Sequence, residues 1–360
     1  MTKYAPVLIP TVCRYQHFKE CLESLSRCID ADKTDVYVIV DYPGREEHWD
    51  GYRKIKHYLE HCGDLGFKTL NNIFRVTNFF YSKKRSNKTL LQPLNNKYDR
   101  YIYSEDDIIF SPNFLVYMNK SLEAFKDDSD IIMVSGYSYP IRWDVSSGAT
   151  CLKQNVNASV WGAGYWIEKQ ETVSNYINSG QLLDEVGNVI HKETYKRMID
   201  ASLREYIPAS VYPWRKDCHF FLALSDISMR AYLAVADKYV VSPVISKVRN
   251  LGFDGSGVYC QTINTGLNGD TAGTYNYSKQ PIDKSNTFEL VLDTKQNDKE
   301  NHDRLNRFDV RTPAEMRRTR LYLWLMTHFG VWAGKACAII LFPFDFSLRA
   351  FRKIWRTIKE

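Results

Sequence analysis

Three consecutive acidic residues, Glu105, Asp106 and Asp107, follow a short apolar run and are followed directly by Ile108 and Ile109. Carboxylates crowded beside a core repel one another and lose hydration unless cations or hydrogen-bond donors compensate them. Mg²⁺ or Mn²⁺ would provide this compensation, since it is often held by one or two carboxylates with phosphate oxygens and water. The three acids therefore indicate a site for a divalent cation and a phosphate-bearing ligand. A solvated loop after a strand is the alternative interpretation.

The acids follow one of several strands that alternate with helices in the first part of the chain. Apolar runs predict strands at 5–11, 35–44, 71–78, 99–107 and 130–137, and apolar residues at helical spacing predict helices at 15–29, 48–62 and 111–125. We expect Ser111 to cap the last of these helices. Alternating strands and helices imply an α/β fold with a Rossmann-like, mostly parallel sheet flanked by helices.

Polar residues follow four of these strands. Arg14 lies just beyond the first, Asp41 and Asn78 end the second and third, and the acidic residues end the fourth. Ligands of open α/β sheets bind beyond the carboxyl ends of the strands, so we expect these residues at one edge. No G-x-G-x-x-G or Walker A loop follows the first strand, which disfavours dinucleotide-binding and P-loop proteins.

Bulk composition narrows the class of protein. The 360 residues carry a net charge of +6, which suits an anionic small molecule or membrane but does not require nucleic acid, and we expect no nucleic-acid partner. The eight cysteines show no C-x-x-C pair or zinc-finger spacing, as expected of reduced thiols in a cytoplasmic protein. Pro6 and Pro10 interrupt the first apolar run, which is too short for a signal peptide.

The stretch IYSEDDIIFSPNFLVYMNKSLEAF resembles the metal-binding segment of GT-A-fold glycosyltransferases, as in N-acetylglucosaminyltransferase I and bacterial surface-polysaccharide sugar transferases of the family-2 type. Four other stretches resemble motifs of that family in the same order: CRYQHFKECLESL, VYVIVDYPG, ASVWGAGYW and VRNLGFDGSGVY. The resemblance covers about residues 5–260. It implies a GT-A fold and transfer of a sugar from a nucleotide-diphosphate sugar.

The resemblance also implies roles for individual residues. Asp107 would ligate Mn²⁺ or Mg²⁺, and Glu105 and Asp106 would contact the ribose or the donor sugar. Arg14 and Asp41 would contact the nucleotide, and Trp161 and Gly162 would contact the sugar. The resemblance also includes a late motif, which contains Asn250, Gly252, Asp254, Gly255 and Gly257. Tyr259 stands where the relatives often have a histidine, so a second protein ligand for the metal is in question.

Other residues have two interpretations each. Asp217 is either the general base of an inverting transfer or the N-cap of the helix after it. The basic residues Lys83, Lys84, Arg85 and Lys88 form a solvated loop or bind a diphosphate or lipid-linked acceptor. Trp161 and Trp166 stack on a sugar or fill the core.

The chain ends in a tail of different composition. We expect a glycosyltransferase domain over 1–262, with a nucleotide-binding half at 1–150 and an acceptor half at 151–262, then a polar irregular segment at 263–310 and a basic, apolar helical tail at 311–360. The tail suits docking on an anionic membrane, although it could pack on the core. Lys335 lies in the middle of its apolar run and disfavours a spanning helix.

Together these features predict a metal-dependent, inverting glycosyltransferase that uses a nucleotide sugar, with UDP as the expected nucleotide. The acceptor would be a glycan or lipid-linked glycan, and the enzyme would be peripheral on the inner face of the cytoplasmic membrane. Two alternatives are a sugar-nucleotide pyrophosphorylase and a non-catalytic, membrane-associated sugar-nucleotide-binding protein. The first would normally show a Gly-rich N-terminal loop with basic residues, and the intact acids disfavour the second.

Overall fold

The structure is a computed structural model that describes residues 4–79, 90–94, 97–155, 158–182, 226–256, 275–295 and 298–308, with individual residues between 321 and 340. The chain divides into two compact units. One consists of Met1–Glu171 and Tyr239–Val310, and the other of Thr172–Lys238 and Arg311–Glu360. The domain limits expected from the sequence stay predictions.

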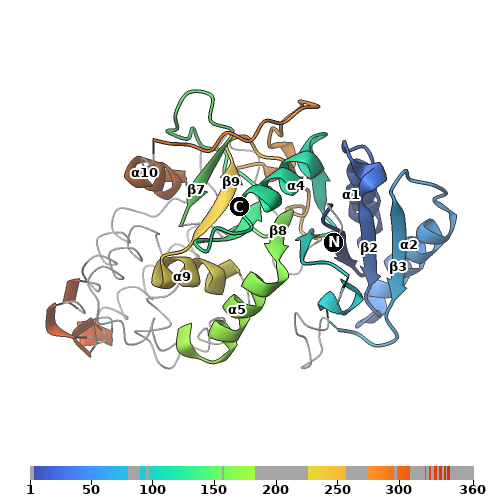
Figure 1. The fold of residues 1–360 in the computed structure, drawn as a ribbon. Helices are drawn as coiled ribbons and strands as arrows, with labels where there is room; N and C mark the ends of the chain where they lie inside the picture. The colour runs from blue at the N-terminus through green and yellow to red at the C-terminus, as the bar shows by residue number, and fades with distance from the viewer. Residues whose placement is uncertain are drawn as a thin grey trace, which may run out of the picture. The chain divides into compact units, whose positions relative to one another are not determined.

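The first unit is built on an eight-stranded sheet in the order β3-β2-β1-β4-β8-β6-β9-β7 (Figure 1). Its strands are β1 (Val7–Thr11), β2 (Asp35–Val40), β3 (Thr69–Phe74), β4 (Arg100–Tyr103), β6 (Ile131–Ser135), β7 (Cys151–Gln154), β8 (Ala163–Trp166) and β9 (Tyr239–Pro243). The pairs from β3 to β4 are parallel, as is β6 with β9, whereas β8 is antiparallel to β4 and β6, and β7 to β9. The predicted α/β class with a mostly parallel sheet is confirmed.

The helices are α1 (Tyr15–Ser26), α2 (Trp49–His61), α4 (Phe114–Ala124), α5 (Ile167–Asn178), α9 (Asp226–Ala236) and α10 (Asp298–Phe308). Short 3-10 turns lie at Ala31–Lys33, Glu46–His48, Gln92–Leu94 and Tyr277–Lys279. In the part of the chain that is described, no helix combines the length and the apolar character that crossing a membrane requires.

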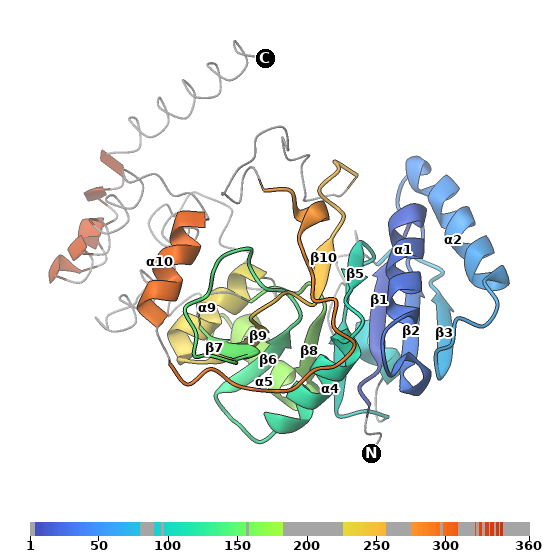
Figure 2. The same cartoon turned by 90° about the horizontal axis from the view of Figure 1, so that it is seen from above.

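Local sequence explains the first elements. All six residues of β2 are buried, as expected of a central parallel strand covered on both faces. In α1, Phe18, Cys21, Leu22 and Leu25 recur at helical spacing and are all buried, so they form the face that packs on the core. Figure 2 shows α1 lying along β1 and β2 with α2 beside it.

A second, two-stranded sheet joins distant parts of the sequence. β5 (Ile108–Phe110) pairs antiparallel with β10 (Val248–Asn250), and Asn250 lies opposite Ile108 (Figure 2). β5 begins directly after the three acids, and β10 leads into the late motif. This pairing therefore brings the late motif to the acidic residues.

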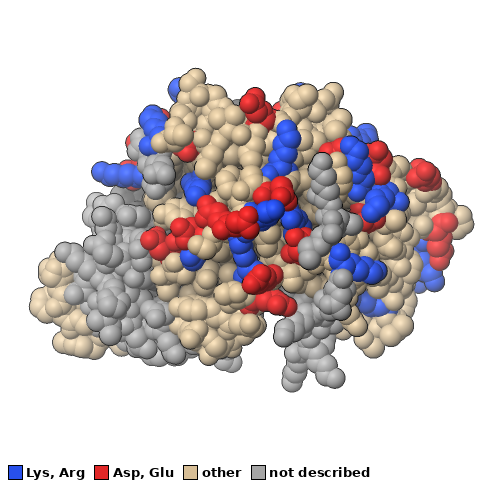
Figure 3. Space-filling view, in the orientation of Figure 1, with Lys and Arg blue, Asp and Glu red and all other residues tan. Residues whose placement is uncertain are grey.

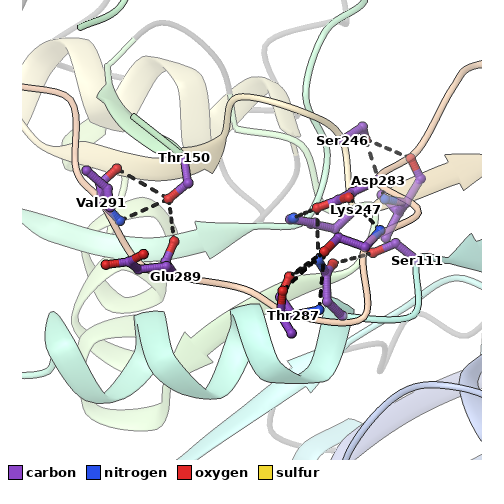
Figure 4. A network of polar contacts seen from close by, with 11 residues as sticks. Ser111, Thr150, Ser246, Lys247, Asp283, Thr287, Glu289 and Val291 are labelled. Carbon is purple, nitrogen blue, oxygen red and sulfur yellow. Dashed lines mark hydrogen bonds and ion pairs between the residues drawn. The ribbon is translucent and has the colours of Figure 1, made fainter. Parts of the chain in front are cut away.

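A network of polar contacts ties the chain after residue 280 to the start of β10 (Figure 4). Lys247, 3% exposed, forms an ion pair with Asp283. The amide of Asn113 donates hydrogen bonds to the Asp283 carboxylate (2.8 Å) and to the carbonyl of Thr287 (2.9 Å). The backbone N–H of Ser111 donates to the Lys247 carbonyl at 2.8 Å. These contacts fix the entry into β10 against the end of β5.

Candidate functional site

The three acids occupy the bend between β4 and β5. Asp106 and Asp107 are buried, at 5% and 3% exposed, whereas Glu105 is half-buried. A solvated loop therefore does not describe Asp106 and Asp107. Lys and Arg are mixed with Asp and Glu on the described surface that Figure 3 shows, in keeping with the mild net charge.

Arg14 supplies a cation to this bend. It directly precedes α1, and its guanidinium forms ion pairs with Asp106 and, at 2.7 Å from Nη1 to Oδ2, with Asp107. The Thr11 hydroxyl, at the end of β1, donates to the other oxygen of Asp106 at 2.7 Å. Burial opposes the charge of Arg14, but the two carboxylates outweigh it and raise the pKa of Arg14 above its ordinary value.

Arg14 and the acids were expected at one edge of the sheet, but Arg14 was assigned to the nucleotide. Its ion pairs with the acids were therefore not predicted. Thr11 was missed altogether. Its place as the last residue of the first strand was the one signal that could have shown it.

One oxygen of Asp107 has no partner among the described residues. Its Oδ1 is buried and receives no hydrogen bond from the described residues. Burial raises the pKa of the Asp107 carboxyl, and although Arg14 opposes this, repulsion from Asp106 adds to it. An unpaired buried polar group costs about 1–3 kcal/mol, so a ligand at Oδ1 would remove a penalty.

The donor set fits a divalent cation shared with a substrate. No group of three or more His, Cys, Asp or Glu side chains arranged to hold a metal occurs among the described residues. A cage made of protein ligands alone is therefore not formed by them. Mg²⁺ and Mn²⁺ sites built from one or two carboxylates, substrate phosphates and water need no such cage, and the free oxygen of Asp107 suits that arrangement.

The late motif closes over Asp107. The N–H of Leu251 donates to the Asp107 carbonyl at 2.8 Å. A Cβ atom on Gly252 would lie 2.1 Å from Asp107 Oδ2 and 3.1 Å from Arg14 Nη1, so a larger residue does not fit without displacement. Asn250 Oδ1 accepts the N–H of Gly252 at 2.6 Å and holds this turn in place. Three motifs from distant parts of the sequence thus meet at one carboxylate.

A second contact links the late motif to α1. His17 Nε2 lies 3.1 Å from Asp254 Oδ2. Asp254 Oδ1 accepts the N–H of Ser256 at 2.9 Å, and Gly255 between them has a φ of 87°, which favours glycine. The spacing of Arg14 and His17 thus places one residue on the acids and the other on the late motif.

Asp41 organises the loops after β2 and β3. Its buried carboxylate accepts the N–H of Phe79 at 2.8 Å and the side-chain amide of Asn78 at 3.3 Å. The same amide of Asn78 also donates to the carbonyl of Tyr42 at 2.5 Å. Asp41 and Asn78 therefore hold two strand ends together, and a nucleotide contact by Asp41 stays a prediction.

Trp161 belongs to an aromatic cluster. Its ring lies 4.7 Å from that of Tyr137, 5.7 Å from Phe253 and 5.8 Å from Tyr277, measured between centroids. Phe253 follows Gly252 within the late motif, so the cluster, in which Tyr137 and Tyr277 are buried and Trp161 and Phe253 half-buried, includes part of that motif. Packing with other rings accounts for Trp161, and its contact with a sugar stays a prediction.

Gly162 and Trp166 pack in the core, and a contact of Gly162 with a sugar stays a prediction. Gly162 has a φ of 59°, and a Cβ there would lie 2.8 Å from Val248 and 3.0 Å from Phe114. Trp166 is buried, and its Nε1 donates to the carbonyl of Leu122 at 3.1 Å. For Trp166 the core interpretation is therefore correct.

Several predicted residues lie outside the described residues. They are Asp217, Gly257, Tyr259 and the basic residues Lys83, Lys84, Arg85 and Lys88.

Comparison with known proteins gives structural matches alone. No family model matches the chain, and no curated protein matches it. Among solved structures, S. aureus TarS matches at 14% identity and a TM-score of 0.31 over 47% of this chain and 29% of TarS, so this chain spans less than a third of that protein.

Other solved structures also match part of the chain. A fragment of TarS in complex with UDP-GlcNAc matches at 16% identity and a TM-score of 0.31, over 48% of each chain. The mannosyltransferase PcManGT from Pyrobaculum calidifontis, in complex with GDP-Man and Mn²⁺, matches at 13% identity and a TM-score of 0.36, over 64% of this chain and 69% of that one. All these TM-scores lie below 0.5, so no ligand of these proteins is transferred to this chain.

Proposed function

We propose that this protein is a metal-dependent, inverting glycosyltransferase that moves a sugar from a nucleotide-diphosphate sugar, with UDP as the expected nucleotide, to a glycan or lipid-linked glycan. The single observation that carries the proposal is the buried Asp106–Asp107–Arg14 cluster, in which one oxygen of Asp107 has no partner among the described residues. The order of the five motifs along the sequence supports it.

Charge balance favours a cation at this cluster. Asp106 and Asp107 bring two negative charges, and Arg14 brings one positive charge that both carboxylates share. A divalent cation on Asp107 would reverse the remaining charge and attract a diphosphate. Bound there, Mn²⁺ or Mg²⁺ would stabilise the nucleoside diphosphate as it leaves the sugar.

The residues around the cation would divide the remaining work. Arg14 holds the two buried carboxylates in place through its ion pairs. Because Gly252 has no side chain, the Asp107 carboxylate fits against it, and the late motif covers this side of Asp107. Glu105, half-buried at the start of the bend, would contact the ribose or the donor sugar. Asp106 already accepts hydrogen bonds at both oxygens, so its contribution to donor binding would pass through Arg14 and Thr11.

Inversion by direct displacement needs a base near the acceptor hydroxyl. We assign this role to Asp217, which comes after the Trp-Gly stretch in the sequence, as the corresponding acid does in the resembling family. The N-cap role stays open because Asp217 lies outside the described residues.

A panel of UDP- and GDP-sugars tests the function. We expect transfer to an acceptor, or slow hydrolysis of the sugar nucleotide, that EDTA abolishes and added Mn²⁺ restores. Turnover that EDTA does not change would contradict metal dependence. Formation of a sugar nucleotide from a sugar 1-phosphate and UTP would instead support the pyrophosphorylase, and tight binding of a sugar nucleotide without any turnover would support the non-catalytic alternative.

A further inference from the structure

Several large apolar side chains near the C-terminus are exposed. In the described residues between 321 and 340, Trp332 is 71% exposed, Ile340 67%, Phe329 56% and Ile339 48%. The described residues around them are helical, apart from Gly330. Clustered exposed apolar side chains mark a surface that another molecule covers.

The three positions furthest along this stretch share a side. Counted at about 100° per residue, Trp332, Ile339 and Ile340 fall within an arc of roughly 100° on a helix. Three large apolar side chains exposed on one side of a helix suit a surface that lies along an interface.

The charges of this stretch are of one sign. Residues 316–344 contain no Asp or Glu, whereas Arg317, Arg318, Arg320 and Lys335 lie within this range. Five further cations follow in the sequence: Arg349, Arg352, Lys353, Arg356 and Lys359. The apolar residues are thus bracketed by cations, and the complementary partner carries negative charge.

An anionic lipid surface fits both features better than a second copy of this chain. Two copies would bring like charges together, with no carboxylate between 316 and 344 to pair with them. Phospholipid headgroups present phosphates to the cations, and the acyl boundary accepts Trp and Ile side chains. A lysine at a membrane surface keeps its ammonium among the headgroups and its methylene stem in apolar surroundings, so the presence of Lys335 in this run of the sequence is compatible with docking.

We propose that residues 321–340 dock on the surface of an anionic bilayer, with Trp332, Ile339 and Ile340 entering the headgroup region and the neighbouring arginines pairing with lipid phosphates. The contact is interfacial and does not require a spanning helix. It is independent of the catalytic proposal.

Flotation of the full-length protein with vesicles tests this. We expect recovery with phosphatidylcholine vesicles that contain 30% phosphatidylglycerol, much less with phosphatidylcholine alone, and weaker binding in high salt because the attraction is electrostatic. The double variant Trp332→Gln/Ile340→Gln should lower the partition coefficient about tenfold or more. Replacing Arg317, Arg318 and Arg320 with Gln should lower it roughly fivefold per charge on anionic vesicles.

A matched control is Ile245→Gln. Ile245 is 58% exposed and lies in the first unit, so its loss should not change vesicle binding. Circular dichroism and thermal unfolding confirm that each variant is folded. Equal recovery with and without phosphatidylglycerol, or wild-type binding by the Trp332→Gln/Ile340→Gln variant, would overturn the proposal. Concentration-dependent self-association that this double variant abolishes would assign the surface to a second copy and overturn it as well.

Discussion

Gly252→Ala is the sharpest perturbation of the candidate site, because it adds one methyl group and removes nothing. The added Cβ would lie 2.1 Å from Asp107 Oδ2, whereas ordinary contact begins at 3.4 Å, so the carboxylate or the turn must move by about 1.3 Å (3.4 − 2.1). The backbone of Gly252 does not lie in the left-handed region, so alanine brings no conformational strain of its own. The variant therefore reports on the contact with Asp107.

A shift of this size should affect chemistry more than folding. A misplacement of about 1 Å at a reacting centre can lower the rate about 100-fold, and overpacking typically costs about 1–3 kcal/mol of stability. We expect kcat/KM to fall by about two orders of magnitude and the Mn²⁺ concentration for half-maximal rate to rise. Initial rates over a Mn²⁺ series, with thermal unfolding of the same sample, measure both.

Gly66→Ala is the matched control. Gly66 is exposed, has a φ of 76°, and has no atom within 4 Å of a Cβ built on it. Alanine there should cost about 1 kcal/mol through backbone strain and leave the Mn²⁺ dependence unchanged. If Gly252→Ala keeps the wild-type rate and Mn²⁺ dependence, the late motif does not position Asp107 and the reasoning is refuted.

Three further predictions concern other parts of the chain. Lys247→Met should lower the unfolding free energy, measured with denaturant, by about 3 kcal/mol, because it leaves Asp283 without its ion pair. Adding Asp283→Asn should recover part of this loss, and strictly additive losses would contradict the pairing. Burial raises the pKa of the Asp35 carboxyl, but its hydrogen bonds outweigh this and hold the pKa below its ordinary value. The stability that Asp35 contributes should therefore be present above about pH 4 and be lost as the pH falls further, so a pH-independent difference in unfolding free energy from Asp35→Asn would count against it. Asp217→Asn should lower turnover by about 10²–10⁴-fold if Asp217 is the base, and unchanged turnover with a loss of only ~1 kcal/mol of stability would assign it to a helix cap.

The sequence predicted the first part of the fold well because its signals are local. Buried apolar runs gave β1 and β2, and helical spacing gave α1. The start of α4 was placed too early, however. Its N-cap is Asn113, and the hydroxyl of Ser111 donates to that side chain at 3.0 Å, so the predicted cap at Ser111 was wrong.

The parts that were not predicted depend on distant contacts. β8 lies antiparallel between β4 and β6, and the pattern of apolar residues within any single strand does not indicate this position. The pairing of β5 with β10 joins segments about 140 residues apart. The predicted site residues near the acids do meet, but the ion pairs of Arg14 and the contact of Gly252 depend on rotamers and on distances of a few tenths of an ångström, which spacing in a sequence does not encode.

Calorimetric titration of Mn²⁺ into the protein with UDP present tests the central claim most directly. The wild type and an Asp32→Asn control, which alters an exposed carboxylate, should bind Mn²⁺ and UDP together. Asp107→Asn should keep its thermal unfolding close to that of the wild type and lose the Mn²⁺-dependent part of UDP binding. Wild-type binding of Mn²⁺ and UDP by Asp107→Asn would contradict the assignment of Asp107 as the metal ligand.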